Sequence, residues 1–578
     1  MQFRELATYL ERLEKTSSRL EITGILTELY KASPAPEIDK VVYLSLGILA
    51  PNYEGVLLNL AEKMMVRTLA KAYQKDVSEV LGLFKKIGDI GSVAQELGIG
   101  HKVSGMGLSV TDVYERLLEI AKDSGEGSQD TKVEKMADLL GKLDSLSVRF
   151  VSRIPVGRLR LGFSEKTVID ALSAGDKKLS GEIEEAYNIR PDIGYIAKLV
   201  KEGNPKSAKP VIGVPVVPML AQRLNSTTEM IKKMGEVSVE PKFDGLRIFI
   251  HYRKKDNFLR IFTRNMNAIP LETFPELAEV GKYIKADEVI LDSEAIGVDP
   301  KREMFLDFQK TIQRRRKHDV EKTAGEVPLQ FQVFDLILVD GKNLINIPYI
   351  QRREMLEKVV VNGKLLRIDE NTITTDPEMI RKLHERYLKI GLEGVVVKKA
   401  NGFYVSGRTG WNWVKMKEEE GRQGRLSDTV DCVIMGYTAG KGKRVGFGMG
   451  QFLAGIADGD KFKTVTKVGT GLTDDQFREL KKRLSKVQVK EKPKEYEVNK
   501  DLTPDFWVEP EVLVELAADE ITVSPKHTAG LALRFPRLIQ FRDDKSPKDA
   551  TTVSELHEMF KLQNSQSVLD LSSSFVKR

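Results

Sequence analysis

The sequence predicts a multidomain fold in three parts: an all-α N-terminal domain, a central α+β domain and a small C-terminal β-barrel. Three observations carry this prediction. Apolar residues recur at helical spacing through the first two hundred residues, β-rich runs alternate with helical stretches from Val237, and glycine-punctuated strands follow Arg425. A chain of 578 residues is also too long for one hydrophobic core. We therefore expect domains over residues 1–209, 210–424 and 425–578.

The N-terminal domain is predicted to be helical because its apolar residues lie three and four apart, as at Phe3, Leu6, Leu10 and Leu13. The same spacing returns between Val110 and Ile120. Residues 122–130 form a polar connector, and Ser164 is placed to cap a helix that runs through Leu172. Two prolines among small residues at 203–210 predict a linker that ends this domain.

The other two domains are predicted from runs of strand-forming residues. In the central domain these runs cover 289–296, 329–336 and 394–398, and helical stretches separate them. After residue 425 the strands become shorter, at 430–434, 452–456 and 465–468. Short strands broken by glycine are typical of a small β-barrel.

The composition excludes several classes of protein. Lys and Arg number 91 against 84 Asp and Glu, and this mild excess of +7 suits a nucleic-acid partner without proving one. A charge run such as Arg314–Lys317 is by default a solvated helix face. The single cysteine, Cys432, rules out a disulfide framework and a cysteine zinc site and fits a reducing compartment. Since no apolar run approaches the ~20 residues that cross a bilayer, we expect a cytoplasmic protein.

One stretch of the central domain carries a strong chemical signal. Lys242 stands two residues before Asp244-Gly245 and five before Arg247, between runs that predict strand, tight turn and strand. A lysine fixed at a strand end is a candidate covalent nucleophile. Burial, Arg247 or a bound metal must then destabilise its ammonium, because an ordinary lysine titrates near ~10.4. Taken alone, the motif also fits a hairpin whose Asp-Gly is only turn chemistry.

Further candidates follow along the central domain, each with a plainer alternative. Asp292 and Glu294 share one face of a predicted strand and can accept hydrogen bonds from ribose or metal-bound water, although solvated strands also alternate acids. Phe334 stands at a strand end, where it stacks on a base or packs in the core. Glu393 precedes an apolar strand and suits a hard divalent cation. Basic candidates for phosphate contact are Arg264, Lys415 and Lys417.

The order and spacing of these residues resemble the nucleotidyltransferase motifs of ATP-dependent DNA ligases, and the resemblance covers nearly the whole chain. Segments similar to the helical DNA-binding domain of archaeal and eukaryotic replicative ligases, and to the start of their catalytic domain, lie at 158–162, 167–171, 190–194 and 217–221. Segments similar to the last family motif lie at 533–537 and 542–547. The resemblance implies an adenylyltransferase domain, ATP-grasp-like and of the nucleotidyltransferase type, followed by an OB-fold barrel.

The resemblance also implies a role for each matching residue. Lys242 becomes adenylylated, Glu240 and Phe334 hold adenine, Glu294 binds the ribose, and Glu294 and Glu393 serve as ligands of Mg²⁺. The basic residues assigned to sugar and phosphate are Arg247, Arg264, Arg408, Lys415, Lys417, Arg542 and Lys545. Among them, Arg542 and Lys545 orient the pyrophosphate leaving group. Arg408 stands in for a family arginine whose position falls here near Trp411.

The implied function is sealing of 5′-phosphate, 3′-hydroxyl nicks with ATP and Mg²⁺, through a lysyl-AMP intermediate and a DNA-adenylate, in replication, repair and recombination. We expect a monomer whose partner is nicked double-stranded DNA and which does not bind a membrane. Several archaeal relatives carry a glutamine and paired aromatics that dock on the sliding clamp. Because residues 101–108 lack this pattern, clamp binding through that loop is not expected. The absence of a long N-terminal extension favours an archaeal-type enzyme.

Two rival functions share parts of the pattern. An RNA ligase or capping guanylyltransferase has the lysine motif but usually lacks the helical domain. A catalytically silent DNA-binding clamp or scaffold would keep the architecture, but it need not retain Lys242, Glu294, Glu393 and Lys417 together. NAD⁺ is a poorer co-substrate, because a single Cys432 offers no counterpart to the cysteine-bound zinc of the NAD⁺-dependent ligases.

Overall fold

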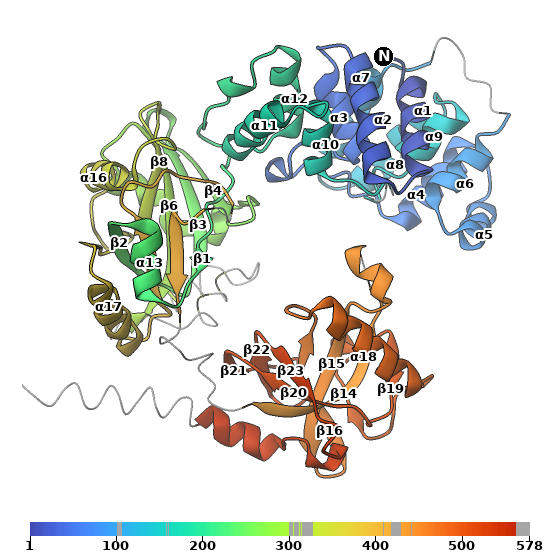
Figure 1. The fold of residues 1–578 in the computed structure, drawn as a ribbon. Coiled ribbons are helices and arrows are strands. Elements are labelled where there is room, and N and C mark those ends of the chain that lie inside the picture. Colours follow the sequence, from blue (N-terminus) through green and yellow to red (C-terminus); the bar gives the residue numbers. More distant parts are fainter. Residues whose placement is uncertain are drawn as a thin grey trace, which may run out of the picture. The chain divides into compact units, whose positions relative to one another are not determined.

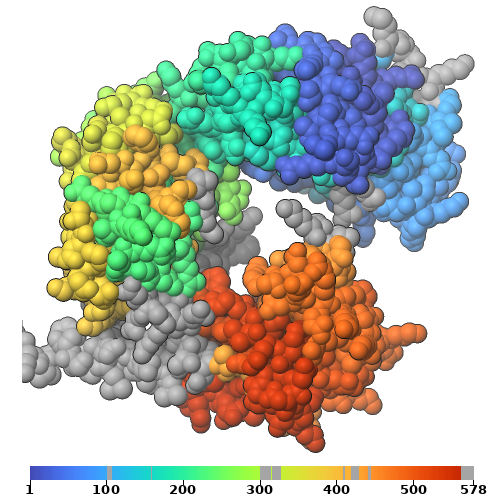
Figure 2. Space-filling model, viewed as in Figure 1, coloured from blue at the N-terminus to red at the C-terminus, as the bar shows by residue number. Residues whose placement is uncertain are grey.

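The computed structural model describes residues 1–100, 107–157, 159, 161–299, 304–305, 311, 314, 327–407, 410–417, 429–440 and 442–561 (Figure 1). The chain forms two compact units. The first comprises Met1–Gln222, Glu236–Ile373 and Lys398–Trp413, and the second comprises Arg223–Gly235, Thr374–Val397 and Val414–Arg578. Figure 2 shows the surface, and its colours follow the residue numbers. The predicted boundaries near 209 and 424 stay a prediction.

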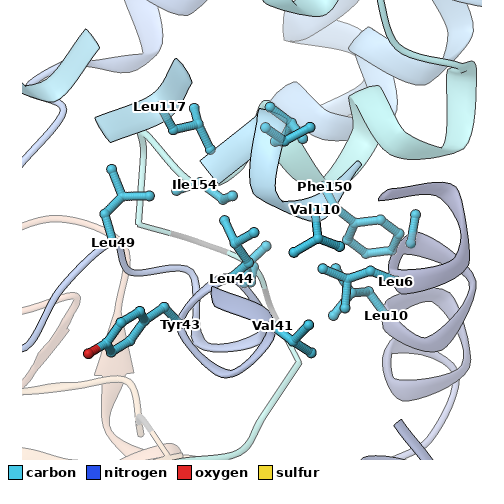
Figure 3. Packing of buried hydrophobic residues seen from close by; sticks show 14 of the residues in the cluster. Leu6, Leu10, Val41, Tyr43, Leu44, Leu49, Val110, Leu117, Phe150 and Ile154 are labelled. Carbon is cyan, nitrogen blue, oxygen red and sulfur yellow. The ribbon is translucent and has the colours of Figure 1, made fainter. Parts of the chain in front are cut away.

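The first unit begins with a helical part, as the apolar spacing predicts. Its helices are α1 (Phe3–Glu14), α2 (Arg19–Ala32), α3 (Ile38–Leu46), α4 (Glu62–Ala72), α5 (Val77–Ile87), α6 (Ile90–Leu97), α7 (Val110–Lys122), α8 (Ser128–Leu140), α9 (Ser145–Val151), α10 (Glu165–Leu172), α11 (Lys177–Ile189) and α12 (Ile193–Lys201). Ser164 is at the expected N-cap position of α10, but its side chain makes no capping hydrogen bond. Figure 3 shows Leu6 and Leu10 of α1 beside Phe150 of α9 and Val110 of α7, all buried in one apolar core.

The same unit contains the central sheet, with strand order β10-β8-β6-β3-β4-β5 and two short strands paired at its margin. Its strands are β3 (Leu246–Arg253), β4 (Phe258–Thr263), β5 (Ala268–Ile269), β6 (Glu288–Asp299), β7 (Met304–Phe305), β8 (Leu329–Val339), β9 (Lys342–Asn343) and β10 (Leu366–Ile368). Only β10 runs parallel to its neighbour among the described ladders of this sheet. In the β3–β6 ladder Arg247 lies opposite Glu294, so two predicted site residues meet at the centre of the sheet.

Four of the five remaining strands of the central region contain a boundary between the two units: β1 (Gln222–Arg223), β11 (Thr372–Thr374), β12 (Gly394–Lys399) and β13 (Trp413–Met416). The fifth strand, β2 (Val237–Lys242), belongs to the first unit. Helix α16 (Tyr349–Val359) packs on β8 within the first unit. In the second unit α13 (Thr227–Met234) packs on α17 (Pro377–Lys389).

A network of backbone and side-chain contacts joins the helical part to the central sheet. Arg260 of β4 donates to the carbonyl oxygens of Tyr53 (2.8 Å) and Gly213 (2.9 Å), and it pairs with Glu54 at 3.2 Å. The ring of Tyr53 is buried and meets the edge of Phe262. Both sides of this contact belong to one unit, so the 3-10 turn that follows α3 and the backbone at Gly213 pack against the strand that leads to Arg264.

The second unit is dominated by a C-terminal sheet half-barrel, as the glycine-punctuated strands predict. Its main path is β17-β19-β14-β15-β16-β18, and β20 and β23 extend it from β14. The strands are β14 (Val430–Thr438), β15 (Gln451–Asp458), β16 (Lys461–Val468), β17 (Gln488–Val489), β18 (Tyr496–Glu497), β19 (Phe506–Val508), β20 (Leu513–Ala517), β21 (Glu520–Val523), β22 (Leu531–Arg534) and β23 (Arg537–Phe541). Helix α18 (Asp474–Lys486) packs its apolar face into the barrel core. None of the helices in the described ranges is long and apolar enough to cross a bilayer.

Candidate active site

Lys242 is the last residue of β2, the position that the sequence predicts for a fixed nucleophile. Its side chain is half-buried, and its ammonium donates to the carbonyl oxygen of Phe243 at 3.4 Å. The following Asp-Gly does not close a hairpin, because β3 pairs with β4 and β6. Gly245 is needed for a different reason. A Cβ atom there would lie 2.4 Å from the carbonyl oxygen of Ala295, so only glycine lets the lysine loop lie this close to β6.

Glu240, two residues before the lysine, is buried in a polar network. Its carboxylate accepts hydrogen bonds from Ser238 Oγ at 2.9 Å and from the hydroxyl of Tyr349, and it forms an ion pair with Lys398. Only 1% of the Glu240 side chain is exposed, so the paired ammonium is what keeps a charged carboxylate tolerable here. The residue that the sequence assigns to adenine is therefore held rigidly on the same strand as Lys242.

Lys398 is a buried residue of the predicted site that the sequence analysis did not single out. Its side chain is 1% exposed, and its ammonium donates to the carbonyl oxygen of Phe334 at 2.9 Å and lies 4.7 Å from the ring centres of Phe334, Tyr349 and Trp413. A desolvated ammonium between aromatic rings is stabilised by their negative faces. Lys398 thus links Glu240 to Phe334, the two residues predicted to hold the base.

A second buried acid, Asp369, belongs to this network. Arg353 donates to a carboxylate oxygen of Asp369 at 2.6 Å. Burial and the nearby charge of Glu240 outweigh Lys398 and Arg353 and raise the pKa of Asp369 to about 8. The base-side network therefore combines one ammonium, one guanidinium and two carboxyl groups away from bulk water.

Arg247 is fixed by a two-pronged ion pair with Asp292. The guanidinium donates to the two carboxylate oxygens at 2.9 and 2.6 Å, and its third contact is the carbonyl oxygen of Met219 at 2.6 Å. Burial alone would lower the pKa of Arg247, but the charge and hydrogen bonds of Asp292 raise it above its ordinary value. Tyr404 also donates to Asp292, at 3.3 Å. Asp292, expected as an acceptor for ribose or metal-bound water, thus holds Arg247 instead.

The other predicted residues of the first unit are half-buried or exposed, and Phe334, expected at a strand end, lies in the middle of β8. Glu294 is half-buried on β6, and Arg264 is exposed in the turn after β4. Phe334 is half-buried on β8, and its ring meets Trp413 edge to face at 6.0 Å. The guanidinium of Arg247 lies 5.6 Å from the ring of Phe334. Glu240, Arg247 and Phe334 are therefore joined through direct contacts and Lys398.

In the second unit, Glu393 and Lys417 form an ion pair of 2.7 Å with side chains 16% and 26% exposed. Lys415 lies on β13 and is half-buried, whereas Lys417 directly follows the end of that strand at Met416. Of the two lysines predicted on one side of a strand, Lys417 contacts the predicted metal ligand. Two more predicted positions, Arg408 and the segment 101–106, lie outside the described residues.

Arg542 and Lys545 lie at the end of β23 and share one carboxylate. Asp431 of β14 accepts from Arg542 Nη1 at 3.1 and 3.2 Å and from Lys545 Nζ at 2.6 Å. Arg542 also donates to both carboxylate oxygens of Asp544, at 2.9 and 2.8 Å. The Asp544 hydrogen bonds, followed by the charge of Asp431, raise the pKa of Arg542. The two predicted pyrophosphate contacts are thus brought together.

Carboxylate oxygens are suitable ligands for Mg²⁺, which usually binds through one or two protein carboxylates and substrate phosphates. Within the described ranges, no cluster of three or more His, Cys, Asp and Glu side chains forms a metal cage. Glu294 and Glu393 are each partly accessible, and each offers one carboxylate. Each carboxylate taken by itself suits a Mg²⁺ ion that binds through one protein carboxylate and substrate phosphates.

Three family models match consecutive parts of the chain. The model of the ATP dependent DNA ligase domain matches residues 218–417, and this range contains Lys242 and the whole base-side network. The model of the DNA ligase N terminus matches residues 2–173, within the helical part. The model of the ATP dependent DNA ligase C terminal region matches residues 446–545, on the half-barrel.

Full-length relatives and a solved structure agree with these matches. A probable DNA ligase of Dictyoglomus thermophilum is 41% identical over 98% of this chain and 99% of its own, and a DNA ligase of Saccharolobus solfataricus is 37% identical over 97% and 98%. A solved structure described as Pmar-Lig_Pre covers 93% of this chain and 99% of its own at 19% identity, with a TM-score of 0.52, which supports the fold. The chain therefore belongs to the ATP-dependent DNA ligases, enzymes with ATP as co-substrate and DNA as substrate.

Proposed function

We propose that this ligase seals 5′-phosphate, 3′-hydroxyl nicks in duplex DNA through a covalent AMP on Lys242. The observation that carries the proposal is the position of Lys242 at the end of β2, two residues after a buried carboxylate that is already fixed by three partners. A nucleophile needs a fixed approach to phosphorus, and a strand end beside a rigid base site supplies one.

Three in-line displacements make up the reaction. Lys242 Nζ attacks the α-phosphorus of ATP, the new N–P bond replaces the bond to pyrophosphate, and pyrophosphate leaves. An oxygen of the DNA 5′-phosphate then attacks the same phosphorus and breaks the N–P bond. Finally the 3′-hydroxyl attacks the 5′-phosphate, and AMP leaves as the phosphodiester forms. All three steps develop negative charge on phosphate oxygens, so they are served by positioned cations more than by acid–base chemistry.

We assign the surrounding residues in line with the family pattern. Glu240 and Phe334 select and stack adenine, Glu294 binds the ribose, and Arg247 and Arg264 contact sugar and phosphate. Lys415 and Lys417 neutralise the α-phosphate, and Arg542 and Lys545 orient pyrophosphate. Arg408 is proposed for the adenylate from its sequence position alone.

Mg²⁺ held by Glu294 and Glu393 would screen the phosphate charge. Because Glu393 pairs with Lys417 at 2.7 Å, metal binding there has to share the carboxylate with this lysine. We further propose the OB-fold assignment of the half-barrel, a monomeric state, and roles in replication, repair and recombination.

The test is covalent labelling with ATP carrying label at the α-phosphate, with Mg²⁺, followed by denaturation. Wild-type protein should retain label. Lys242→Arg is the matched control, since it keeps the positive charge but removes the nucleophilic amine. Label on both proteins, or on neither when the wild type is first freed of bound AMP, would contradict the mechanism. A chase with nicked duplex DNA should release the label and join the strands, whereas a chase with RNA, or labelling by GTP, should not succeed.

A further inference from the structure

The two cations predicted to orient pyrophosphate, Arg542 and Lys545, are neutralised within the half-barrel itself. Both contact a single oxygen of Asp431: Arg542 Nη1 lies 3.2 Å and Lys545 Nζ 2.6 Å from Oδ2. Two cations converging on one anionic oxygen are also the arrangement in which a terminal phosphate oxygen is bound. The carboxylate thus has the chemical character of the ligand that these residues are proposed to hold.

The local charge balance is unfavourable for a polyphosphate while this contact persists. Arg542 and Lys545 supply two positive charges, whereas Asp431, Asp544 and Glu515 supply three negative ones, with Glu515 at 3.8 Å from Arg542. Asp431 is the central member, because it alone among the described carboxylates pairs with both cations. Pyrophosphate can gain these cations only if Asp431 gives them up.

The position of Asp431 is fixed by its own strand and does not depend on the cations. Its backbone N–H donates to Thr551 Oγ1 at 3.0 Å, its carbonyl oxygen accepts from Thr551 N at 2.9 Å, and β14 pairs it with Glu515 of β20. Of the two cations, Lys545 is the more accessible, with a long side chain that is 34% exposed against 17% for Arg542. The acid therefore stays in place while the cations can leave it and return.

We propose that Asp431 is an internal counter-ion that competes with pyrophosphate for Arg542 and Lys545 and thereby promotes pyrophosphate release after Lys242 is adenylylated. The inference rests on the proposed function of those two residues. Asp431 is a positioning residue, since it acts only through them. When pyrophosphate leaves, the cations return to Asp431, and the reverse attack of pyrophosphate oxygen on the lysyl-AMP phosphorus, which would regenerate ATP, becomes less frequent.

The experiment uses the full chain, labelled with AMP on Lys242 and then mixed with increasing pyrophosphate. With Asp431→Asn, half of the label should be discharged to ATP at a pyrophosphate concentration about two- to fivefold lower than for the wild type, the range expected for one partly exposed ion pair. The KM for ATP in lysine labelling should fall in the same proportion. Asn is isosteric, so a purely steric role would leave both values unchanged.

Asp544→Asn is the matched control. It removes another carboxylate bound to Arg542, but this one is 64% exposed and has no contact with Lys545 among the described pairs, so its effect should be smaller. A higher pyrophosphate requirement with Asp431→Asn would mean that Asp431 orients the cations for binding, and would overturn the inference; so would equal effects of the two variants. If Asp431→Asn lowers the melting temperature strongly, Glu515→Gln should shift discharge in the same direction. Failure of the wild type to carry label at all would instead refute the proposed function.

Discussion

The two arginine–aspartate pairs of the predicted site differ in their surroundings more than in their chemistry. Arg247 and Asp292 are two-pronged partners in the middle of the central sheet, and the Asp292 side chain is fully buried. Arg542 and Asp431 make a similar contact at the end of a barrel strand, with side chains 17% and 12% exposed and with the more accessible Lys545 beside them. The enclosed pair acts as part of the framework, whereas the peripheral pair can exchange partners.

Enclosure by aromatic rings is the physical origin of this difference. The Arg247 guanidinium lies 5.3–5.6 Å from the rings of Phe249, Phe334 and Trp413, so water cannot easily replace Asp292. Arg542 instead faces Asp544, which is largely exposed. Whether an ion pair is structural or exchangeable therefore depends on the groups that surround it.

The largest effect is expected from breaking the enclosed pair. Asp292→Ala should lower the free energy of unfolding by about 3–5 kcal/mol, because the buried Arg247 charge is left without a partner. Chemical denaturation of the full chain measures it. The double variant Arg247→Met with Asp292→Leu should recover much of the loss, since it removes both charges. An Asp292→Ala protein as stable as the wild type would show that the pair is not a framework contact.

A smaller effect is expected at the contact between the helical part and the central sheet. Arg260→Ala should cost about 1–3 kcal/mol, because three hydrogen bonds from a partly exposed guanidinium are lost. It should also weaken binding of nicked DNA more than it slows labelling of Lys242. Arg253→Ala on the neighbouring strand is the control, because its ion pair with Asp256 is local. Equal DNA affinities for the two variants would argue against a coupling role for Arg260.

The same region predicts a pH dependence. His251 is fully buried, its Nδ1 accepts from Gly213 N at 3.1 Å, and burial followed by the charge of Arg260 lowers its pKa to about 3. Below the unfolded pKa of ~6.5 the unfolded chain takes up a proton that the folded chain does not bind, so stability should fall between pH 6.5 and 4.5 with a slope that rises from about 0.7 toward about 1.4 kcal/mol per pH unit. His251→Asn should show a flatter slope over that range. Identical slopes would show that His251 is hydrated or rearranged.

The smallest effect on stability is expected for the peripheral pair. Asp431→Asn should shift the melting temperature by less than about 3 °C, because partly exposed ion pairs contribute little. Differential scanning calorimetry of the full chain measures this shift, and Asp292→Ala, which should destabilise the protein strongly, is the comparison. A shift as large as that of Asp292→Ala would show that the peripheral pair stabilises the fold as much as the enclosed pair does.

The sequence predicted the elements better than the contacts between them. The strands at 289–296 and 329–336 were expected from apolar alternation, and both are present within longer strands. Arg314 shows the limit of such predictions. The charge run that contains it is expected to be solvated, but Arg314 is 1% exposed and forms an ion pair with Glu276 at 2.8 Å. A run of charged residues does not show whether a side chain is buried, because burial depends on which other parts of the folded chain pack against it.

The site shows the same limit. Lys242 and Arg247 are predicted from the sequence because their spacing along the chain is itself the signal. Lys398 was missed because its partner Glu240 lies in a distant strand, and only the folded sheet reveals that the two charges meet. One sign was available: a lysine closing the apolar run Val395–Val397 is costly to bury without a carboxylate.

The packing of Trp413 has a practical consequence. Its indole is 5% exposed, meets Phe334 and Tyr404 edge to face at 6.0 Å, and lies 4.7 Å from the ammonium of Lys398. Indole emission depends on nearby charge and on ring contacts, so this tryptophan is a built-in optical reporter of the base site. Stopped-flow fluorescence of the enzyme with Trp411 and Trp507 replaced by Phe would then follow nucleotide arrival in real time without any attached dye.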